Sequence, residues 1–91
     1  MRESLVLQHL EEIVEKLNIR ICYENLRRES PLIKSGVCNL KGEYRIIIDK
    51  NLRLSEKIEV ILNALKDFEI DNIYIHPYIR RLIERRKNSQ S

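Results

Sequence analysis

The chain has 91 residues, the size of one domain, and its 43% hydrophobic and 34% charged residues are typical of a folded globular protein rather than a disordered one. We find neither an apolar run long enough to cross a bilayer nor a signal peptide, so we expect a cytoplasmic protein without membrane contact. The formal net charge is +3. Abundant Glu, Ile and Arg with scarce Gln favour a thermophilic source.

The N-terminal segment is predicted to form an amphipathic helix over residues 4–17, because apolar residues recur there at helical spacing with glutamates opposite them. Asn18 is expected to end this helix, since Asn tolerates the left-handed conformation found at many helix ends. The alternating pattern of residues 19–23 predicts a strand, and residues 26–35 are expected to form an irregular loop.

A hairpin over residues 37–48 is the next predicted element, because two strand-favouring runs flank a turn that contains Lys41 and Gly42. A two-residue turn would hold Lys41 at positive φ, which is costly for a residue with a Cβ atom. We therefore favour a type I turn that begins at Asn39, with Gly42 as a left-handed bulge residue.

A helix is predicted over residues 55–68, with the hydroxyl of Ser55 as its N-cap. Its wide apolar stripe is formed by Ile58, Ile61, Leu62, Leu65 and Phe68. Val60 and Ala64 widen this stripe beyond what one small sheet would cover. Because exposed apolar patches mark interfaces, these two residues are candidate interface residues.

The C-terminal part of the chain contains a predicted turn at residues 71–72 and a short apolar run, 73–75, for which an edge strand and an extended connection both remain open. Pro77 suits the first turn of a last helix over residues 77–87, with His76 near its N-cap. The whole pattern predicts a single α+β domain over residues 1–87, with helices on one face of a small three-stranded antiparallel sheet. Residues 88–91 are expected to fray.

Side chains with catalytic potential are few. The two glycines, Gly36 and Gly42, do not open a helix, so there is no glycine-rich phosphate loop. The carboxylates lie on polar helix faces at i,i+3 and i,i+4 spacing, which is typical of a solvated surface rather than of an acid/base pair. We therefore expect no enzymatic activity, no cofactor and no bound metal.

The two cysteines, Cys22 and Cys38, are interpreted first as small buried hydrophobic residues. A disulfide between neighbouring strands is the alternative, particularly in a hyperthermophile. A metal site would need further ligands, and the chain offers only His9 and His76 as histidines.

Positive charge is concentrated at the C-terminal end. Through Ile75 the chain has 12 Lys and Arg against 13 Asp and Glu, whereas five basic residues follow against Glu84 alone. These candidate nucleic-acid contacts are Arg80, Arg81, Arg85, Arg86 and Lys87. They predict either a patch for the phosphate backbone of RNA or DNA, or a basic helix end that complements the helix dipole.

Three stretches of the chain, residues 36–44, 47–50 and 73–80, are similar to a set of short bacterial proteins of unknown function. This resemblance implies a shared fold and no particular activity. The order of the predicted elements also resembles the core of the small zinc peptidases related to the ImmA/IrrE proteins. The H-E-x-x-H motif of those peptidases would fall on residues that do not match it, so no catalytic residue is carried over; they are Leu62, Asn63 and Lys66.

We therefore predict a small non-catalytic α+β domain that works through protein contacts, with self-association as the first candidate. The alternative is nucleic-acid binding through the basic C-terminal helix. A third hypothesis, from another class, is a metal-dependent enzyme that uses Cys22, Cys38 or His76.

Overall fold

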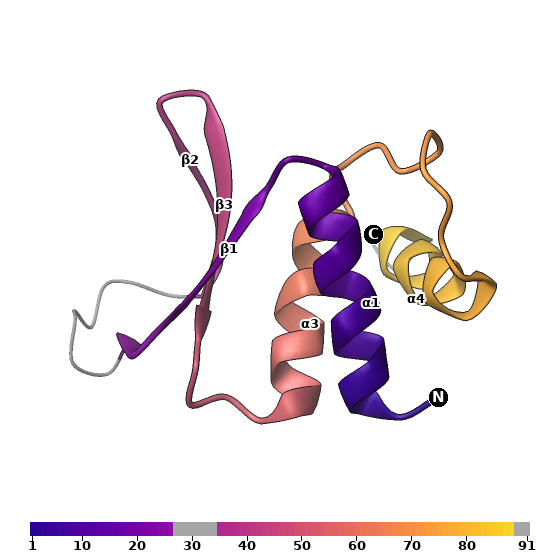
Figure 1. The fold of residues 1–91 in the computed structure, drawn as a ribbon, viewed down its shortest axis with the longest axis horizontal. Helices are drawn as coiled ribbons and strands as arrows, with labels where there is room; N and C mark the ends of the chain where they lie inside the picture. The colour runs from indigo at the N-terminus through magenta and orange to yellow at the C-terminus, as the bar shows by residue number, and fades with distance from the viewer. Residues whose placement is uncertain (27–34, 89–91) are drawn as a thin grey trace.

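Three helices and a three-stranded sheet make up residues 1–26 and 35–88, the part of the chain that the computed structural model describes (Figure 1). In chain order the elements are α1 (Glu3–Lys16), β1 (Arg20–Glu24), β2 (Gly36–Leu40), β3 (Glu43–Asp49), α3 (Leu54–Leu65) and α4 (Pro77–Asn88). The predicted α+β class is thereby confirmed. Most of the predicted 26–35 loop and residues 89–91 lie outside the described residues.

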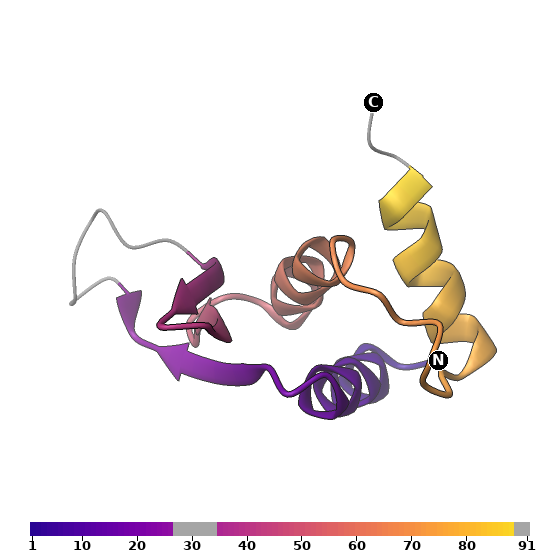
Figure 2. The same ribbon diagram turned by 90° about the horizontal axis from the view of Figure 1, so that it is seen from above.

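The elements are stacked in three layers. Helices α1 and α3 lie side by side against one face of the sheet, and α4 packs on the side of this helix pair that faces away from the sheet (Figure 1, Figure 2). Among the described elements, no helix covers the opposite face of the sheet. The helix pair is therefore the middle layer and is buried from both sides.

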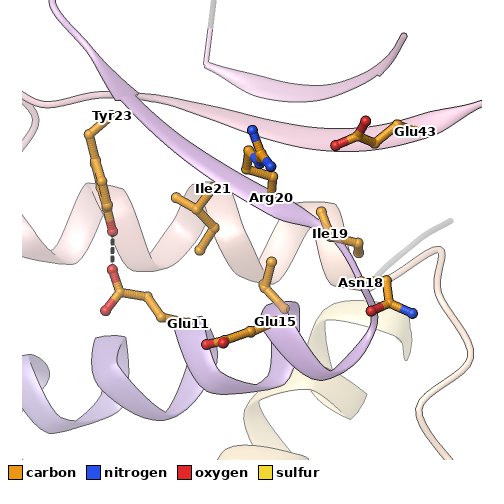
Figure 3. Close-up of a pocket in the computed structure, with 9 residues that line it drawn as sticks. Glu11, Glu15, Asn18, Ile19, Arg20, Ile21, Tyr23 and Glu43 are labelled. Carbon is orange, nitrogen blue, oxygen red and sulfur yellow. Dashed lines mark hydrogen bonds between the residues drawn. The ribbon is translucent and has the colours of Figure 1, made fainter. Parts of the chain in front are cut away.

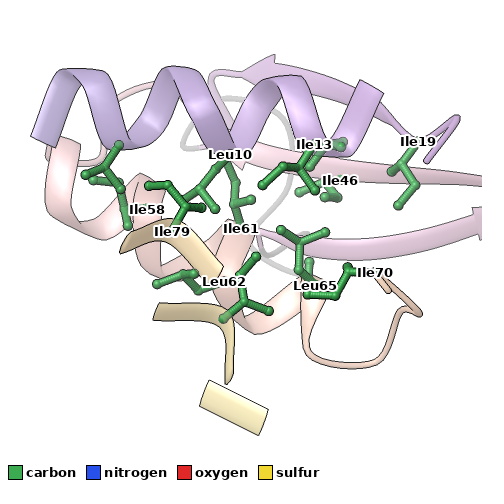
Figure 4. Close-up of a cluster of buried hydrophobic side chains, with 14 of the residues drawn as sticks. Leu10, Ile13, Ile19, Ile46, Ile58, Ile61, Leu62, Leu65, Ile70 and Ile79 are labelled. Atoms are coloured by element: carbon green, nitrogen blue, oxygen red, sulfur yellow. The ribbon is translucent and has the colours of Figure 1, made fainter. Parts of the chain in front are cut away.

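The hydrophobic core lies between the sheet and the helix pair and continues to α4 (Figure 4). Its fully buried side chains include Leu10 of α1, Ile46 of β3, and Ile61 and Leu65 of α3. On the far side of the helix pair, Ile79 is buried in the same way. Each side chain of this size contributes about 1.5–3 kcal/mol when it is removed from water.

The sheet is mixed, and the prediction of an antiparallel sheet is wrong for β1. The strand order is β1-β3-β2; β1 runs parallel to β3, with Ile21 opposite Ile46, whereas β2 is antiparallel to β3. The reason is the run Ile46-Ile47-Ile48, which places apolar side chains on both faces and favours the central position between two neighbours. The chain from Glu24 to Glu43 is long enough for the crossover that a parallel pair requires.

The hairpin turn has two residues, so the predicted type I turn with a bulge is wrong. Leu40 lies opposite Glu43, and the two residues between them, Lys41 and Gly42, have φ angles of 54° and 82°. Two positive φ angles match the right-handed twist of the flanking strands. The backbone N–H of Gly42 also donates a hydrogen bond to Asn39 Oδ1 at 3.1 Å, which helps to offset the cost at Lys41.

The ends of α3 differ from the prediction. The predicted N-cap, Ser55, lies inside the first turn, and Arg53 flanks the helix instead. The backbone N–H of Arg53 donates a hydrogen bond to Glu56 Oε1 at 3.0 Å, so the carboxylate three residues along the chain makes the reciprocal contact of a capping box. The helix ends at Leu65, and Phe68 belongs to the segment that follows.

Other helix ends agree with the sequence. Asn18 follows α1 with a φ angle of 60°, and α4 begins at Pro77. The Nδ1 atom of His76 accepts a hydrogen bond from the backbone N–H of Tyr78 at 3.1 Å, which is the cap expected there. Residues 73–75 have no strand partner among the described residues, so they are the extended connection rather than an edge strand.

The turn gives a first prediction. Lys41→Asn should stabilise the fold by up to about 1 kcal/mol, because Asn adopts the left-handed conformation at lower cost than Lys. Gly42→Ala should destabilise it by about 1–2 kcal/mol. A Cβ atom on Gly42 would meet nothing within 4 Å, so this loss would come from the backbone angle alone. Urea unfolding measures both changes, and Lys50→Asn is the matched exposed control; equal stability of all four proteins would contradict the turn.

Candidate functional site

The two cysteines lie on the outer strands of the sheet with β3 between them. Cys22 is opposite Ile47 and Cys38 is opposite Arg45, and both thiols are free. Because residues that face a shared central strand from opposite sides are not neighbours, the chain does not bring the two sulfur atoms together. The disulfide within one chain, which was the alternative interpretation, is therefore not formed, and both cysteines are partly rather than fully buried.

The two histidines meet at the junction of α1 and α4. The ring centroids of His9 and His76 are 5.6 Å apart, beside a cavity of about 150 Å³. Within residues 1–26 and 35–88, however, no three His, Cys, Asp or Glu side chains are placed so that they could hold a metal ion. Cys22 and Cys38 lie on the sheet, in a different part of the molecule. The cysteines and histidines considered as metal ligands are therefore not brought together.

An open pocket of about 540 Å³ lies between α1 and β1 (Figure 3). Three glutamates line it, Glu11 and Glu15 from α1 and Glu43 from β3, together with Arg20 and Tyr23 of β1. The hydroxyl of Tyr23 donates a hydrogen bond to Glu11 Oε2, and this bond joins the helix to the edge strand.

Tyr23 is held in its protonated form. Burial raises the pKa of its hydroxyl, and the hydrogen bond to Glu11 and the negative charge of that carboxylate raise the pKa further. A general base must instead have a pKa near the working pH. The Nζ atom of Lys57 lies 5.6 Å from the centroid of the Tyr23 ring, so contacts from both helices hold this side chain in place. The pocket is therefore interpreted as structural.

A groove of about 480 Å³ runs between β2 and α3. Its apolar part is formed by Val37 from the strand and by the two predicted interface residues, Val60 and Ala64, from the helix. Ala64 is 5% exposed and Val60 is partly buried. Strand β2 therefore already covers part of the apolar surface of α3 that was predicted to be exposed. Charges of both signs line the rim of the groove: Glu59, Asp67, Lys66 and Arg86.

Within residues 1–26 and 35–88, the strand beside this groove is an edge of the sheet that no other described strand pairs with. Edge strands commonly carry charged residues or Pro, which discourage pairing with another chain. At the other edge, β1 has Arg20 and Glu24, but the five residues of β2 include neither a charge nor Pro. Val37 and Leu40 of β2 are also 43% and 50% exposed. The sequence pattern did not lead us to predict this uncharged edge strand, although the absence of charge from residues 35–40 indicated it.

Three of the five basic residues of α4 hold the helix in place. The guanidinium of Arg80 donates to the carbonyl oxygen of Ile73 at 3.2 Å, and Lys87 Nζ donates to that of Phe68 at 3.0 Å. Arg86 forms an ion pair with Glu59 of α3. These side chains fasten α4 to α3 and to the segment that joins the two helices.

The other two basic residues, Arg81 and Arg85, are exposed and form no ion pair within the described part of the chain. Together with Tyr78 they are spaced i, i+3 and i+7, so the three side chains share one exposed face of α4. Of the five basic residues in the predicted patch, these two arginines are therefore the ones that are both exposed and without an ion pair among the described residues.

No protein-family model, curated protein or solved structure matches the chain. The resemblance to short bacterial proteins and to the zinc-peptidase core therefore stays a prediction. As for membranes, no helix in residues 1–26 and 35–88 has both the length and the apolar character needed to cross one.

The α1–β1 contact gives a second prediction. Tyr23→Phe should lower the free energy of unfolding at pH 7 by about 1 kcal/mol, because the hydrogen bond to Glu11 is lost. The folded chain holds the Tyr23 proton more tightly than the unfolded chain, whose tyrosine pKa is about 10. The wild-type advantage should therefore be complete below pH about 10 and shrink as the pH rises beyond it.

Urea unfolding of the two proteins between pH 7 and pH 10.5 measures this difference. Tyr74→Phe is the control, because Tyr74 is 78% exposed and its loss of a hydroxyl should change stability by less than about 0.5 kcal/mol. A difference in the free energy of unfolding between wild type and Tyr23→Phe that grows with pH would contradict the raised pKa of Tyr23.

Proposed function

We propose that this chain is a non-catalytic protein-interaction domain that associates with a second copy of itself through β2 and the groove beside α3. The observation that carries the proposal is the uncharged edge of β2, which lies next to a groove whose apolar part is formed by Val37, Val60 and Ala64. An edge strand offers unpaired backbone groups to an added strand, and a neighbouring groove accommodates side chains of the partner.

The charges around the groove favour a second copy as the occupant. The rim has two acidic residues, Glu59 and Asp67, and two basic residues, Lys66 and Arg86, so it selects neither a strongly acidic nor a strongly basic partner. Such a balanced surface is compatible with itself across a twofold axis, where the same patch contributes to both sides. Charges on an edge strand disfavour pairing, so an uncharged strand is the favoured addition, and β2 of a second copy has no charge.

The strength of the association follows from the size of the surface. Stable protein interfaces bury about 800 Å² per partner. A five-residue strand and one groove provide a smaller surface, so we expect association that depends on concentration in the micromolar range.

Substitutions in this surface should produce monomers. Val60→Glu introduces a charge into the groove, and Val37→Lys places one on the edge strand, where the exposed position leaves the fold intact. Light scattering over a concentration series should show a dimer for the wild type and folded monomers for both variants. Leu5→Glu is the matched control: Leu5 is also an exposed apolar residue, but it lies on α1 and should leave the dimer unchanged.

Two outcomes would overturn the proposal. One is a wild-type protein that stays monomeric at the highest concentration tested. The other is a dimer that Val37→Lys leaves unaffected while circular dichroism shows a native fold.

Nucleic-acid binding is the second candidate, and the exposed face formed by Tyr78, Arg81 and Arg85 favours it. Two cations beside an aromatic ring suit a phosphate backbone and a stacked base. Arg81→Ala and Arg85→Ala should each weaken binding to any RNA or DNA sequence and lower the salt slope by about 1. Fluorescence anisotropy at several salt concentrations measures this, with Lys50→Ala as the control for lost charge; binding that is absent or independent of salt would remove this candidate.

A further inference from the structure

We infer that the second copy pairs antiparallel with β2 about a twofold axis that passes beside Cys38, so that the Cys38 side chains of the two copies face each other. This inference rests on the proposed function, because it assigns the geometry of the same self-association. It joins the two three-stranded sheets into one continuous sheet.

The hairpin determines which backbone groups of β2 are available. Antiparallel strands alternate between residues that exchange hydrogen bonds with the partner and residues that do not. Next to a two-residue turn the closing pair, Leu40 and Glu43, exchanges both bonds. Cys38 and Gly36 therefore also bond to β3, whereas the N–H and C=O groups of Val37 and Asn39 point to the open edge.

The twofold symmetry then leaves one register that uses the whole strand. Outward-pointing residues must oppose outward-pointing residues, so the axis passes beside Val37, Cys38 or Asn39. Only the axis at Cys38 lets all five residues of β2 pair, with Val37 opposite Asn39 and Gly36 opposite Leu40. The other two registers pair three residues within the strand and leave apolar Leu40 or Gly36 without a partner.

In this register the thiols come within bonding range. Opposite residues that do not exchange hydrogen bonds have Cα atoms about 4.5 Å apart, and disulfides form at Cα separations of about 4.4–6.8 Å. Cys38 shares its face of the sheet with its neighbour Arg45, which is the face that no described helix covers. The thiol is free and partly exposed, so a reagent has access to it.

The same arrangement accounts for the apolar part of the groove. Opposite residues of antiparallel strands point to the same face, so the helices of both copies lie on one side of the joined sheet. Helix α3 is the helix that contacts β2, and it therefore faces α3 of the second copy across the axis. Val60 and Val37 lie in the space between the two helices, where an apolar lining gains from burial.

The opposite edge of the sheet provides the internal control. Cys22 is on β1, whose edge has Arg20 and Glu24, and this strand is not part of the proposed interface. Cross-linking that requires Cys38 and not Cys22 therefore distinguishes the proposed pairing from random collision of exposed thiols.

The experiment is oxidation of the full chain by glutathione disulfide, followed by non-reducing electrophoresis. Two Cys38 thiols lose two electrons and two protons to form one disulfide, while one glutathione disulfide is reduced to two glutathione thiols. Cys22→Ser should form the linked dimer as readily as the wild type, and Cys38→Ser should lose it. Adding Val37→Lys to Cys22→Ser should slow the linkage at least about tenfold, since the edge pairing is disrupted.

The outcomes separate this inference from the proposed function. A dimer in light scattering that is linked through Cys38 supports both. A dimer that gives no Cys38 linkage, or is linked through Cys22, overturns the register and leaves self-association standing. A monomer at all concentrations in light scattering overturns both. A monomer that instead binds an extended peptide along β2 would assign this edge to a different partner, and it would overturn the inference as well.

Discussion

The structure depends on the burial of the isoleucines of β3. Ile46 and Ile48 are completely buried against the helix pair, and Ile47 is partly buried on the opposite face. A strand with apolar side chains on both faces is most stable in the middle of a sheet, where both of its edges are also paired. This constraint forces β1 and β2 to the outside, although they are the first two strands in the chain. The free edges of the sheet, and with them the surface on which the proposed association rests, follow from it.

Basic side chains of α4 reach backbone carbonyls and a carboxylate on neighbouring segments, as Arg80, Arg86 and Lys87 show. The Nζ atom of Lys87, for example, donates a hydrogen bond to the carbonyl oxygen of Phe68, which lies just beyond the end of α3. A positively charged segment in a small protein is therefore not by itself a ligand site. Only the basic side chains that make no contact within the fold remain available to a ligand.

The class of the fold and most of its helices follow from the sequence, because amphipathic periodicity and turn residues are local properties. The end of α1 at Asn18 and the start of α4 at Pro77 belong to this group. The direction of β1 could not be obtained in this way, since strand order depends on which strand buries most surface in the assembled sheet. The type of the turn at Lys41 was predicted wrongly for a related reason. The twist of the whole hairpin outweighs the preference of one lysine for a negative φ angle.

The candidate site was only partly predictable. Val60 and Ala64 stand out as surplus apolar residues on a helix, and the structure places both in the groove. Val37 was not singled out, because an exposed position on a strand becomes recognisable only when the strand is known to be an edge. Likewise, the five basic residues of α4 are equivalent in sequence, and only their distances to carbonyl and carboxylate oxygens divide them into two groups.

The position of α4 has a consequence for the dynamics of the molecule. This helix packs on the helix pair and not on the sheet, and two of its residues, Ile79 and Ile83, are fully buried. Cooperative units with little buried apolar surface open at a lower free energy than the core. Amide protons of α4 should therefore exchange with solvent through a partial opening in which the sheet, α1 and α3 stay folded. We therefore expect α4 to be a less stable unit than the sheet, α1 and α3 within the single fold.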